Sequence, residues 1–96
     1  MTPPGYKTVT VRIEGRVQGV YYRAWTDQTA SRLALDGWVR NRRDGSVEAV
    51  FSGLAPQVDE MLRRCAEGPP DARVTTVGVT DTSGAPPSGF QVLPTH

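Results

Sequence analysis

Apolar and polar residues alternate near the start of the chain in a pattern typical of a half-buried strand. Val9, Val11 and Ile13 are each flanked by polar residues, and successive side chains of a strand point to opposite faces of a sheet. After a glycine-containing loop, apolar residues recur at helical spacing. The pattern therefore predicts a strand over residues 8–14 and a helix over residues 22–35.

The middle of the chain predicts a hairpin followed by a second helix. Residues 38–41 and 46–52 are strand-like, and Asp44-Gly45 between them is a strong signal for an antiparallel hairpin. A second amphipathic helix is expected from about Ala55, and the run Gly68-Pro69-Pro70 stops it.

Two further strand-like runs complete the pattern, at residues 73–80 and, as a short edge strand, at residues 90–93. The order strand, helix, strand, strand, helix, strand is the split βαβ arrangement, an α+β sandwich in which two helices cover one face of a mainly antiparallel sheet. We expect a single domain over residues 1–96, with residues 1–5 as a flexible tail and no linker that would divide it.

Composition excludes several classes of partner. The 96 residues include 11 Lys plus Arg and 10 Asp plus Glu, a net charge of +1, so no global field points to nucleic acid or to an acidic membrane surface. The one cysteine cannot form an internal disulfide, and no segment is apolar enough to span a bilayer or to form a signal-peptide core. We expect a cytoplasmic monomer, without a membrane or nucleic-acid partner.

The loop sequence GRVQGVYYR, residues 15–23, raises an electrostatic question. Arg23 is expected in the first turn of a helix, where the macrodipole disfavours a cation, and the loop contains no Asp or Glu that would offset its charge. The loop between strand and helix also leaves backbone N–H groups without regular partners. Free amides, a helix N-terminus and a guanidinium together can hold a phosphate. The candidate binding residues are Gly15, Arg16, Val17, Gln18, Gly19, Val20 and Arg23.

Spacing alone leaves alternatives open. The two glycines are equally compatible with an ordinary connecting loop that leaves Arg23 in solvent, although a nucleotide-binding P-loop is excluded because the Gly-Lys-Ser/Thr ending is missing. Asn41 carries a donor and an acceptor that could orient an attacking water, but asparagine is also common at the edges of hairpins.

The paired segments GRVQGVYYR and GWVRNRRDGSVEAV, residues 37–50, closely resemble the two signature motifs of the acylphosphatase family. The similarity extends over roughly residues 6–93. It implies a ferredoxin-like α/β sandwich that hydrolyses the carboxyl-phosphate bond of a small acyl phosphate to a carboxylate and inorganic phosphate. The resemblance places the phosphate loop at residues 15–20, the phosphate-binding arginine at Arg23 and the catalytic asparagine at Asn41.

Three positions depart from the family pattern or are variable in it. Ala34 stands where members often have glycine, and Arg42 and Arg43 are consecutive in the hairpin. These differences bear on substrate preference and leave the catalytic positions intact.

The expected chemistry needs no metal, cofactor or general base. An acyl phosphate expels a carboxylate whose conjugate acid has a pKa of about 4, and we hypothesise that the substrate phosphate accepts the proton of the attacking water. Cys65 lies on the apolar stripe of the second helix, and Asp71 stands where a Cys-x5-Arg loop would need arginine, so a buried core thiol is expected. His96, the only histidine, is terminal and expected to be frayed.

Two other functions fit the same architecture. An RNA-binding module would need exposed aromatic residues on its sheet, and the strands over residues 8–14 and 46–52 show no such pair on the face that carries their polar residues. A non-catalytic domain that binds carbamoyl phosphate for a larger protein is the other alternative. The absence of zinc motifs and further domains favours a free-standing hydrolase.

Overall fold

The computed structural model describes residues 5–96, which form two helices and a five-stranded sheet. Most of the predicted tail, residues 1–4, lies outside the described residues, and the carbonyl of Gly5 accepts a hydrogen bond from the Ala55 amide at 2.8 Å. The elements in chain order are β1 (Tyr6–Arg16), α1 (Tyr22–Arg32), β2 (Asp36–Asn41), β3 (Val47–Leu54), α2 (Ala55–Cys65), β4 (Arg73–Asp81) and β5 (Phe90–Val92).

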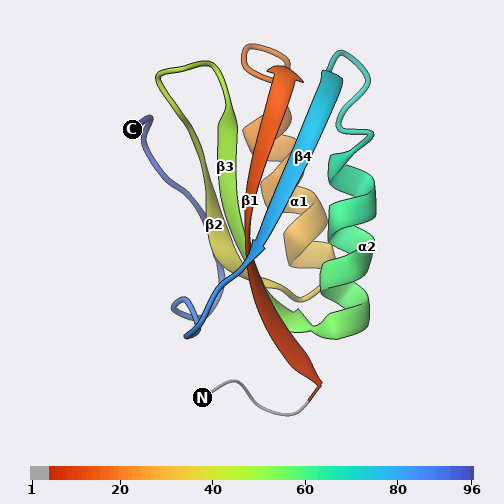
Figure 1. Ribbon diagram of the computed structural model, residues 1–96, viewed down its shortest axis with the longest axis vertical. Coiled ribbons are helices and arrows are strands. Elements are labelled where there is room, and N and C mark those ends of the chain that lie inside the picture. Colours follow the sequence, from red (N-terminus) through yellow and green to blue (C-terminus); the bar gives the residue numbers. More distant parts are fainter. Residues whose placement is uncertain (1–4) are drawn as a thin grey trace.

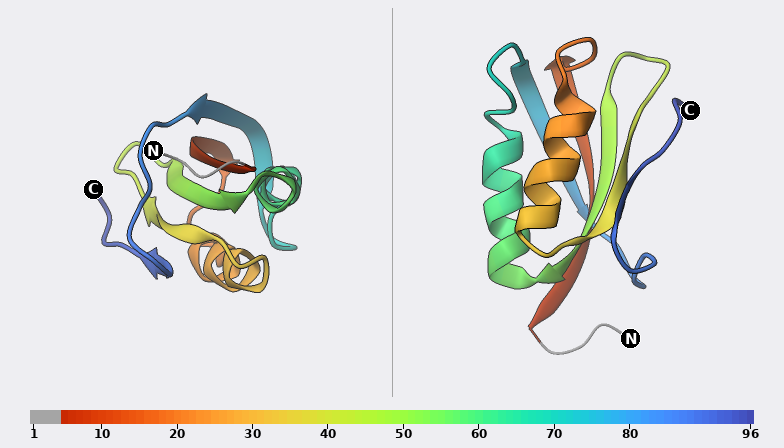
Figure 2. Two further views of the ribbon diagram at one scale, coloured as in Figure 1. Left: turned by 90° about the horizontal axis from the view of Figure 1, so that it is seen from below. Right: turned by 180° about the vertical axis from the view of Figure 1, so that it is seen from behind.

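The strands lie in the order β4-β1-β3-β2-β5, and the first four can be followed in Figure 1. Every neighbouring pair is antiparallel except β2 with β5. Both helices lie side by side on one face of this sheet (Figure 2). The predicted α+β sandwich, with its short additional C-terminal strand, is therefore confirmed. The parallel pairing of β5 places the C-terminal segment along the free edge of β2.

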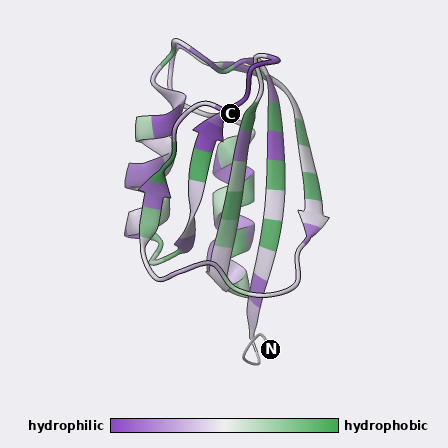
Figure 3. Cartoon of the chain, turned by 90° about the vertical axis from the view of Figure 1, so that its left-hand side faces the viewer, coloured by the Kyte–Doolittle hydropathy of each residue, from purple (hydrophilic) through white to green (hydrophobic). Residues whose placement is uncertain are grey.

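Alternation along the strands separates the two faces of the sheet, and Figure 3 shows it as changing hydropathy along each arrow. The apolar residues of β1 point toward the helices and are at most 1% exposed, and α2 covers them with its own apolar stripe. The predicted core thiol is confirmed, because Cys65 is fully buried on α2 and burial raises its pKa to about 12. The core consists of Val9, Val11, Ile13, Val17, Val20, Tyr22, Ala30, Leu35, Val39, Val47, Ala49, Phe51, Val58, Met61, Cys65 and Ala72.

Helix α1 ends at Arg32, three residues before the predicted end at Leu35. The Leu35 amide donates to the Ala30 carbonyl at 3.0 Å and the Ala34 amide to the Ser31 carbonyl at 3.1 Å, which is the hydrogen-bond pattern of a Schellman motif. Ala34 takes the left-handed position of this motif, with φ at +58°. The apolar pattern continues to Leu35 because Leu35 enters the core from the turn rather than from the helix.

The C-terminal segment is bound to the sheet, so the expectation of a frayed His96 is wrong. The Leu93 amide donates to the Val39 carbonyl at 2.8 Å, and the His96 amide donates to the Asn41 carbonyl at 3.0 Å. Free carbonyls along the edge of β2 bind this segment beyond the end of β5.

Replacing Ala34 by glycine is expected to stabilise the protein. A left-handed conformation is unfavourable by about 1–2 kcal/mol for a residue with a Cβ, and glycine avoids this cost. Glycine also makes the unfolded chain more flexible, which lowers the free energy of unfolding by about 0.4–1 kcal/mol. Ala34→Gly should therefore raise the free energy of unfolding by about 0.5–1 kcal/mol in urea titrations. Ala66→Gly is the matched control, because Ala66 is also exposed but has a right-handed backbone; it should lower the free energy of unfolding. A decrease for both variants would contradict this account of Ala34.

Candidate active site

The site lies at the end of the sheet where β1 leads into α1 and where β2 turns into β3. Ile13 of β1 pairs with Val47 of β3, and Asn41 of β2 pairs with the same Val47. Because both pairings are antiparallel, the loop that follows β1 and the hairpin that precedes β3 emerge at the same end of the sheet. Two segments more than twenty residues apart in sequence therefore become neighbours.

The strand before the loop is longer than predicted. β1 continues past Glu14 to Arg16, and a register shift between Glu14 and Gly15 keeps both added residues paired with β4. Gly15 has φ at +121°, and a Cβ there would lie 2.2 Å from the Arg73 carbonyl oxygen. Gly15 is thus required by the close approach of two strands, and the loop outside regular structure is residues 17–21.

The loop is attached to the rest of the protein at three points. The side chains of Val17 and Val20 are 1% and 6% exposed and belong to the core. The side-chain amide of Gln18 donates two hydrogen bonds of 2.8 Å across to the hairpin, to the carbonyls of Arg42 and Ser46. Among residues 5–96, the amides of Gln18, Gly19 and Val20 have no hydrogen-bond acceptor. The anchored loop therefore presents free donors without being mobile itself.

The N-terminus of α1 has no compensating negative charge. Tyr21 occupies the N-cap in a left-handed conformation with φ at +73°, no side chain caps the helix, and its first turn contains no acidic residue. Arg23 lies in that first turn, and no carboxylate of residues 5–96 lies within 4.0 Å of its guanidinium. Uncapped amides and an unpaired guanidinium at one helix end favour an anion there.

Asn41 is a polar residue in an otherwise apolar row. Gly37, Val39 and Asn41 alternate on the buried side of β2, and Asn41 is only 8% exposed. Its side-chain carbonyl oxygen is buried and has no hydrogen-bond partner within residues 5–96. Leaving such an oxygen unpaired costs about 1–3 kcal/mol, so this side chain is positioned to interact with something other than the folded chain.

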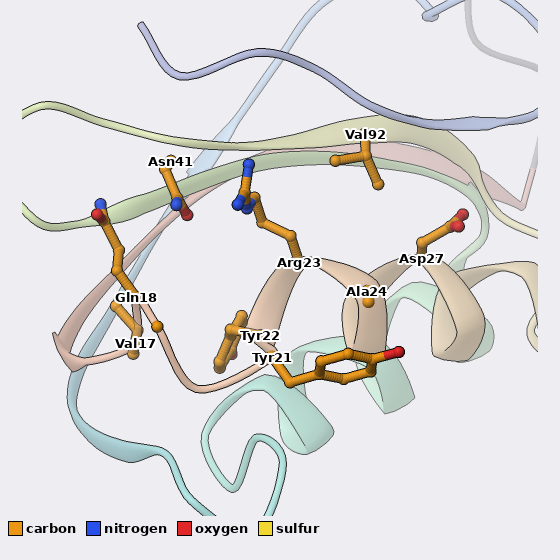
Figure 4. A pocket seen from close by; sticks show the side chains of 10 residues that line it. Val17, Gln18, Tyr21, Tyr22, Arg23, Ala24, Asp27, Asn41 and Val92 are labelled. Atoms are coloured by element: carbon orange, nitrogen blue, oxygen red, sulfur yellow. The ribbon is translucent and has the colours of Figure 1, made fainter.

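These features line one pocket of about 560 Å³. Figure 4 shows the side chains of Arg23 and Asn41 directed toward each other across it. The residues that line the pocket are Val17, Gln18, Gly19, Tyr21, Tyr22, Arg23, Ala24, Asp27, Asn41 and Val92. Of the residues predicted from the sequence, Gly15, Arg16 and Val20 do not line it.

Tyr21 and Tyr22, which lie within the first signature segment, also line the pocket, whereas sequence reasoning missed three lining residues altogether: Ala24, Asp27 and Val92. Asp27 could have been found from helical spacing, because the residue four positions after Arg23 lies on the same side of a helix. No local signal marks Val92, since its place depends on the parallel pairing of β5 with β2.

The hairpin arginines lie outside the pocket. Arg42 donates to a Glu48 carboxylate oxygen at 3.3 Å, and Arg43 is exposed. Next to them the hairpin is stabilised by Asp44, whose carboxylate accepts hydrogen bonds from the Ser46 hydroxyl and amide. These bonds, together with the Arg12 guanidinium, hold the pKa of Asp44 well below its usual range. These contacts stabilise the turn that follows Asn41.

Fold and pocket together describe a small α+β protein with a ligand-sized pocket at one end of its sheet. The chain belongs to the acylphosphatase family, whose model matches residues 9–92, and this confirms the resemblance found in the two sequence motifs.

Individual relatives agree with the family match. An acylphosphatase of Rhizorhabdus wittichii is 53% identical over 85 residues, which cover 88% of this chain and 86% of that protein. An acylphosphatase of Rhodospirillum rubrum is 52% identical over 88 residues, covering 92% and 97% of the two chains. The structure of an acylphosphatase from Coxiella burnetii superposes with a TM-score of 0.92 at 31% identity, covering 97% of this chain and 98% of that one.

The Gln18 side chain is predicted to fix the loop against the hairpin. Gln18→Met keeps the approximate size of the side chain but removes both donated hydrogen bonds, and should lower the free energy of unfolding by about 1–2 kcal/mol. Amide hydrogen exchange should become faster in residues 42–46. Gln28→Met makes the same change at an exposed position of α1 and should alter the stability by less than about 0.5 kcal/mol. Equal effects of the two substitutions would show that the Gln18 bonds do not hold the loop.

Proposed function

We propose that this acylphosphatase binds the phosphate of a small acyl phosphate with Arg23 and the amides of the loop around Gly19, and that Asn41 positions the attacking water. One observation carries the proposal: the buried, unpartnered oxygen of Asn41 faces the unpaired guanidinium of Arg23 across a pocket. A phosphate and a water between them would give both groups the partners that they lack.

Phosphate binding rests on donors that need no rearrangement. Gln18 and Gly19, whose amides are free, line the pocket together with Arg23 at the uncapped start of α1. Charge-assisted hydrogen bonds contribute about 1.5–3 kcal/mol each, so a few of them hold a phosphate. Because loop and helix are anchored in the core before substrate arrives, little free energy is lost in ordering them.

Water activation follows from the chemistry of the amide. The Asn41 carbonyl oxygen accepts a hydrogen bond from the water and orients its lone pair toward phosphorus. The water oxygen then forms a bond to phosphorus while the bond between phosphorus and the acyl oxygen breaks, and the electron pair leaves with the carboxylate. Both protons of the water finish on the phosphate, so a dianionic acyl phosphate gives a carboxylate and dihydrogen phosphate.

No protein group is required as a general base in this scheme. The leaving carboxylate is a weak base, and the substrate phosphate accepts the proton. Asp27 is the only carboxylate among the lining residues, and Figure 4 shows it on the other side of Arg23 from Asn41. It is therefore remote from the water proposed to bind at Asn41. Residues 5–96 contain no cluster of three His, Cys, Asp or Glu side chains that could hold a metal ion.

We propose further that residues 1–96 form one domain, which acts as a monomer in the cytoplasm and does not bind nucleic acid. On the open face of the sheet, the Arg40 guanidinium lies 4.8 Å from the centre of the Trp38 ring and is paired with Glu48, so this ring is already covered. No helix within residues 5–96 has the length and apolar character to cross a membrane.

Substitutions of the two central residues should separate binding from turnover. With benzoyl phosphate as substrate and a chelator present, Arg23→Ala should raise the dissociation constant of inorganic phosphate at least about tenfold, since one charge-assisted contact is lost. Asn41→Ala should lower kcat by about 10²–10³ while phosphate still binds. Because the orphaned oxygen is removed, the free energy of unfolding of Asn41→Ala should not fall.

Arg32→Ala is the control for these substitutions, because Arg32 lies at the exposed end of α1 outside the pocket. It should leave both phosphate affinity and kcat within about twofold, the range of a neutral surface change. Equal activity of the wild type, Arg23→Ala and Asn41→Ala would refute the site assignment, and loss of wild-type activity with chelator would refute the metal-free scheme.

A further inference from the structure

We propose that Asp27 selects the acyl group of the substrate, favouring acyl phosphates whose acyl chain carries a positive charge such as an ammonium group. The inference rests on the proposed function, because it needs the phosphate to bind at the loop and at Arg23. It concerns the other half of the pocket, beyond the groups that bind the phosphate.

The pocket has two ends. Figure 4 shows Gln18 and Asn41 on one side of Arg23, and Asp27 and Val92 on the other. In phosphoryl transfer the attacking and leaving oxygens lie roughly in line through phosphorus. If water is held by Asn41, the acyl oxygen leaves on the opposite side, and the acyl chain extends toward Asp27 and Val92.

This second end has room for an acyl chain and has mostly apolar walls. The pocket volume of about 560 Å³ lies within the range of sites that hold complete small molecules, and a phosphate alone would leave much of it unoccupied. Ala24 and Val92 line this end, and the Tyr21 ring lies close to it, 70% exposed. Such walls accept methylene groups but give no specific contact to a charged substituent.

Asp27 is the exception in this apolar end. It lies one helical turn after Arg23 on the same side of α1 and is half-buried. Its carboxylate has no hydrogen-bond or ion-pair partner within residues 5–96, and its oxygens are more than 4.0 Å from the Arg23 guanidinium. The carboxylate is therefore free to contact a ligand.

A free carboxylate in a phosphate-binding pocket has a definite electrostatic consequence. Its negative charge repels the phosphate dianion and thus weakens binding of every substrate with a neutral acyl group. An ammonium on the acyl chain removes this repulsion and adds an attraction to Asp27, whereas a carboxylate on the chain adds a second repulsion. The pocket should therefore rank substrates by the charge of the acyl chain, with positive before neutral and neutral before negative.

Three acyl phosphates of nearly equal length test this ranking: β-alanyl phosphate with an ammonium, butyryl phosphate with a methyl, and succinyl phosphate with a carboxylate. Values of kcat/KM are measured at neutral pH and low salt for the wild type, Asp27→Asn and Asp27→Lys. In Asp27→Asn, kcat/KM for β-alanyl phosphate relative to that for butyryl phosphate should fall by about fivefold. The value of kcat/KM for succinyl phosphate relative to that for butyryl phosphate should rise by a similar factor, which is the effect expected of one partly exposed ion pair.

Two further comparisons show that the effect is local. Asp27→Lys should shift both ratios further in the same directions, and high salt should shrink the differences because the groups are partly exposed. Asp71→Asn is the matched control, because it changes the net charge equally at an exposed position outside the pocket. It should leave both ratios at their wild-type values.

The outcomes distinguish this inference from the proposed function. If the wild type fails to hydrolyse butyryl phosphate, the proposed function itself is wrong. If the wild type hydrolyses the substrates but Asp27→Asn changes all three rates by one common factor, Asp27 acts only on phosphate binding and the selection of the acyl group is refuted. Ratios that move in opposite directions for the two charged substrates support the inference.

Discussion

The antiparallel pairing of β1 with β3 is the constraint on which the site depends. It runs from Tyr6 with Leu54 to Ile13 with Val47, so the end of β1 and the beginning of β3 lie at the same end of the sheet. The loop proposed to bind phosphate follows the first of these ends, and the hairpin that carries Asn41 precedes the second. The two Gln18 hydrogen bonds then join loop and hairpin directly. A shift of this register by one residue would place Asn41 and the loop on opposite faces of the sheet.

The same end of the molecule holds most of the local free-energy costs found in the structure. An orphaned oxygen at Asn41, a left-handed backbone at Tyr21 and an uncapped helix in front of Arg23 are each unfavourable by about 1–3 kcal/mol or less. None of them is needed for the fold, because the core elsewhere is apolar and well covered. A bound phosphate and water would supply the contacts that the Asn41 oxygen and the uncapped helix lack, as expected of a site whose groups are arranged to bind a reacting substrate.

The sequence was sufficient for the order of the elements, for the hairpin at Asp44 and for the paired motifs that identify the family, because these follow from periodicity and turn chemistry within short windows. It failed at the end of α1, where an unusual residue fills a local turn, and at two places that distant contacts determine. The end of α1 is set by a turn in which Ala34 takes a position usually held by glycine, and the extension of β1 past Glu14 is stabilised by pairing with β4. Val92 enters the pocket through a parallel pairing that no local pattern predicts.

In the proposed scheme, substrate selection cannot come from the phosphate end of the pocket. There the loop amides, Arg23 and Asn41 would contact atoms that every acyl phosphate shares, so they would contribute equally to the binding of all such substrates. Discrimination therefore depends on side chains beyond Arg23, where the structure places two apolar residues and one free carboxylate. An apolar wall distinguishes acyl chains weakly, because one methylene group changes the binding free energy by at most about 1–3 kcal/mol. It makes no contact that depends on the charge of the acyl chain. A carboxylate does distinguish charge, so Asp27, one of the three lining residues that sequence reasoning missed, is the residue best placed to give this enzyme a substrate preference.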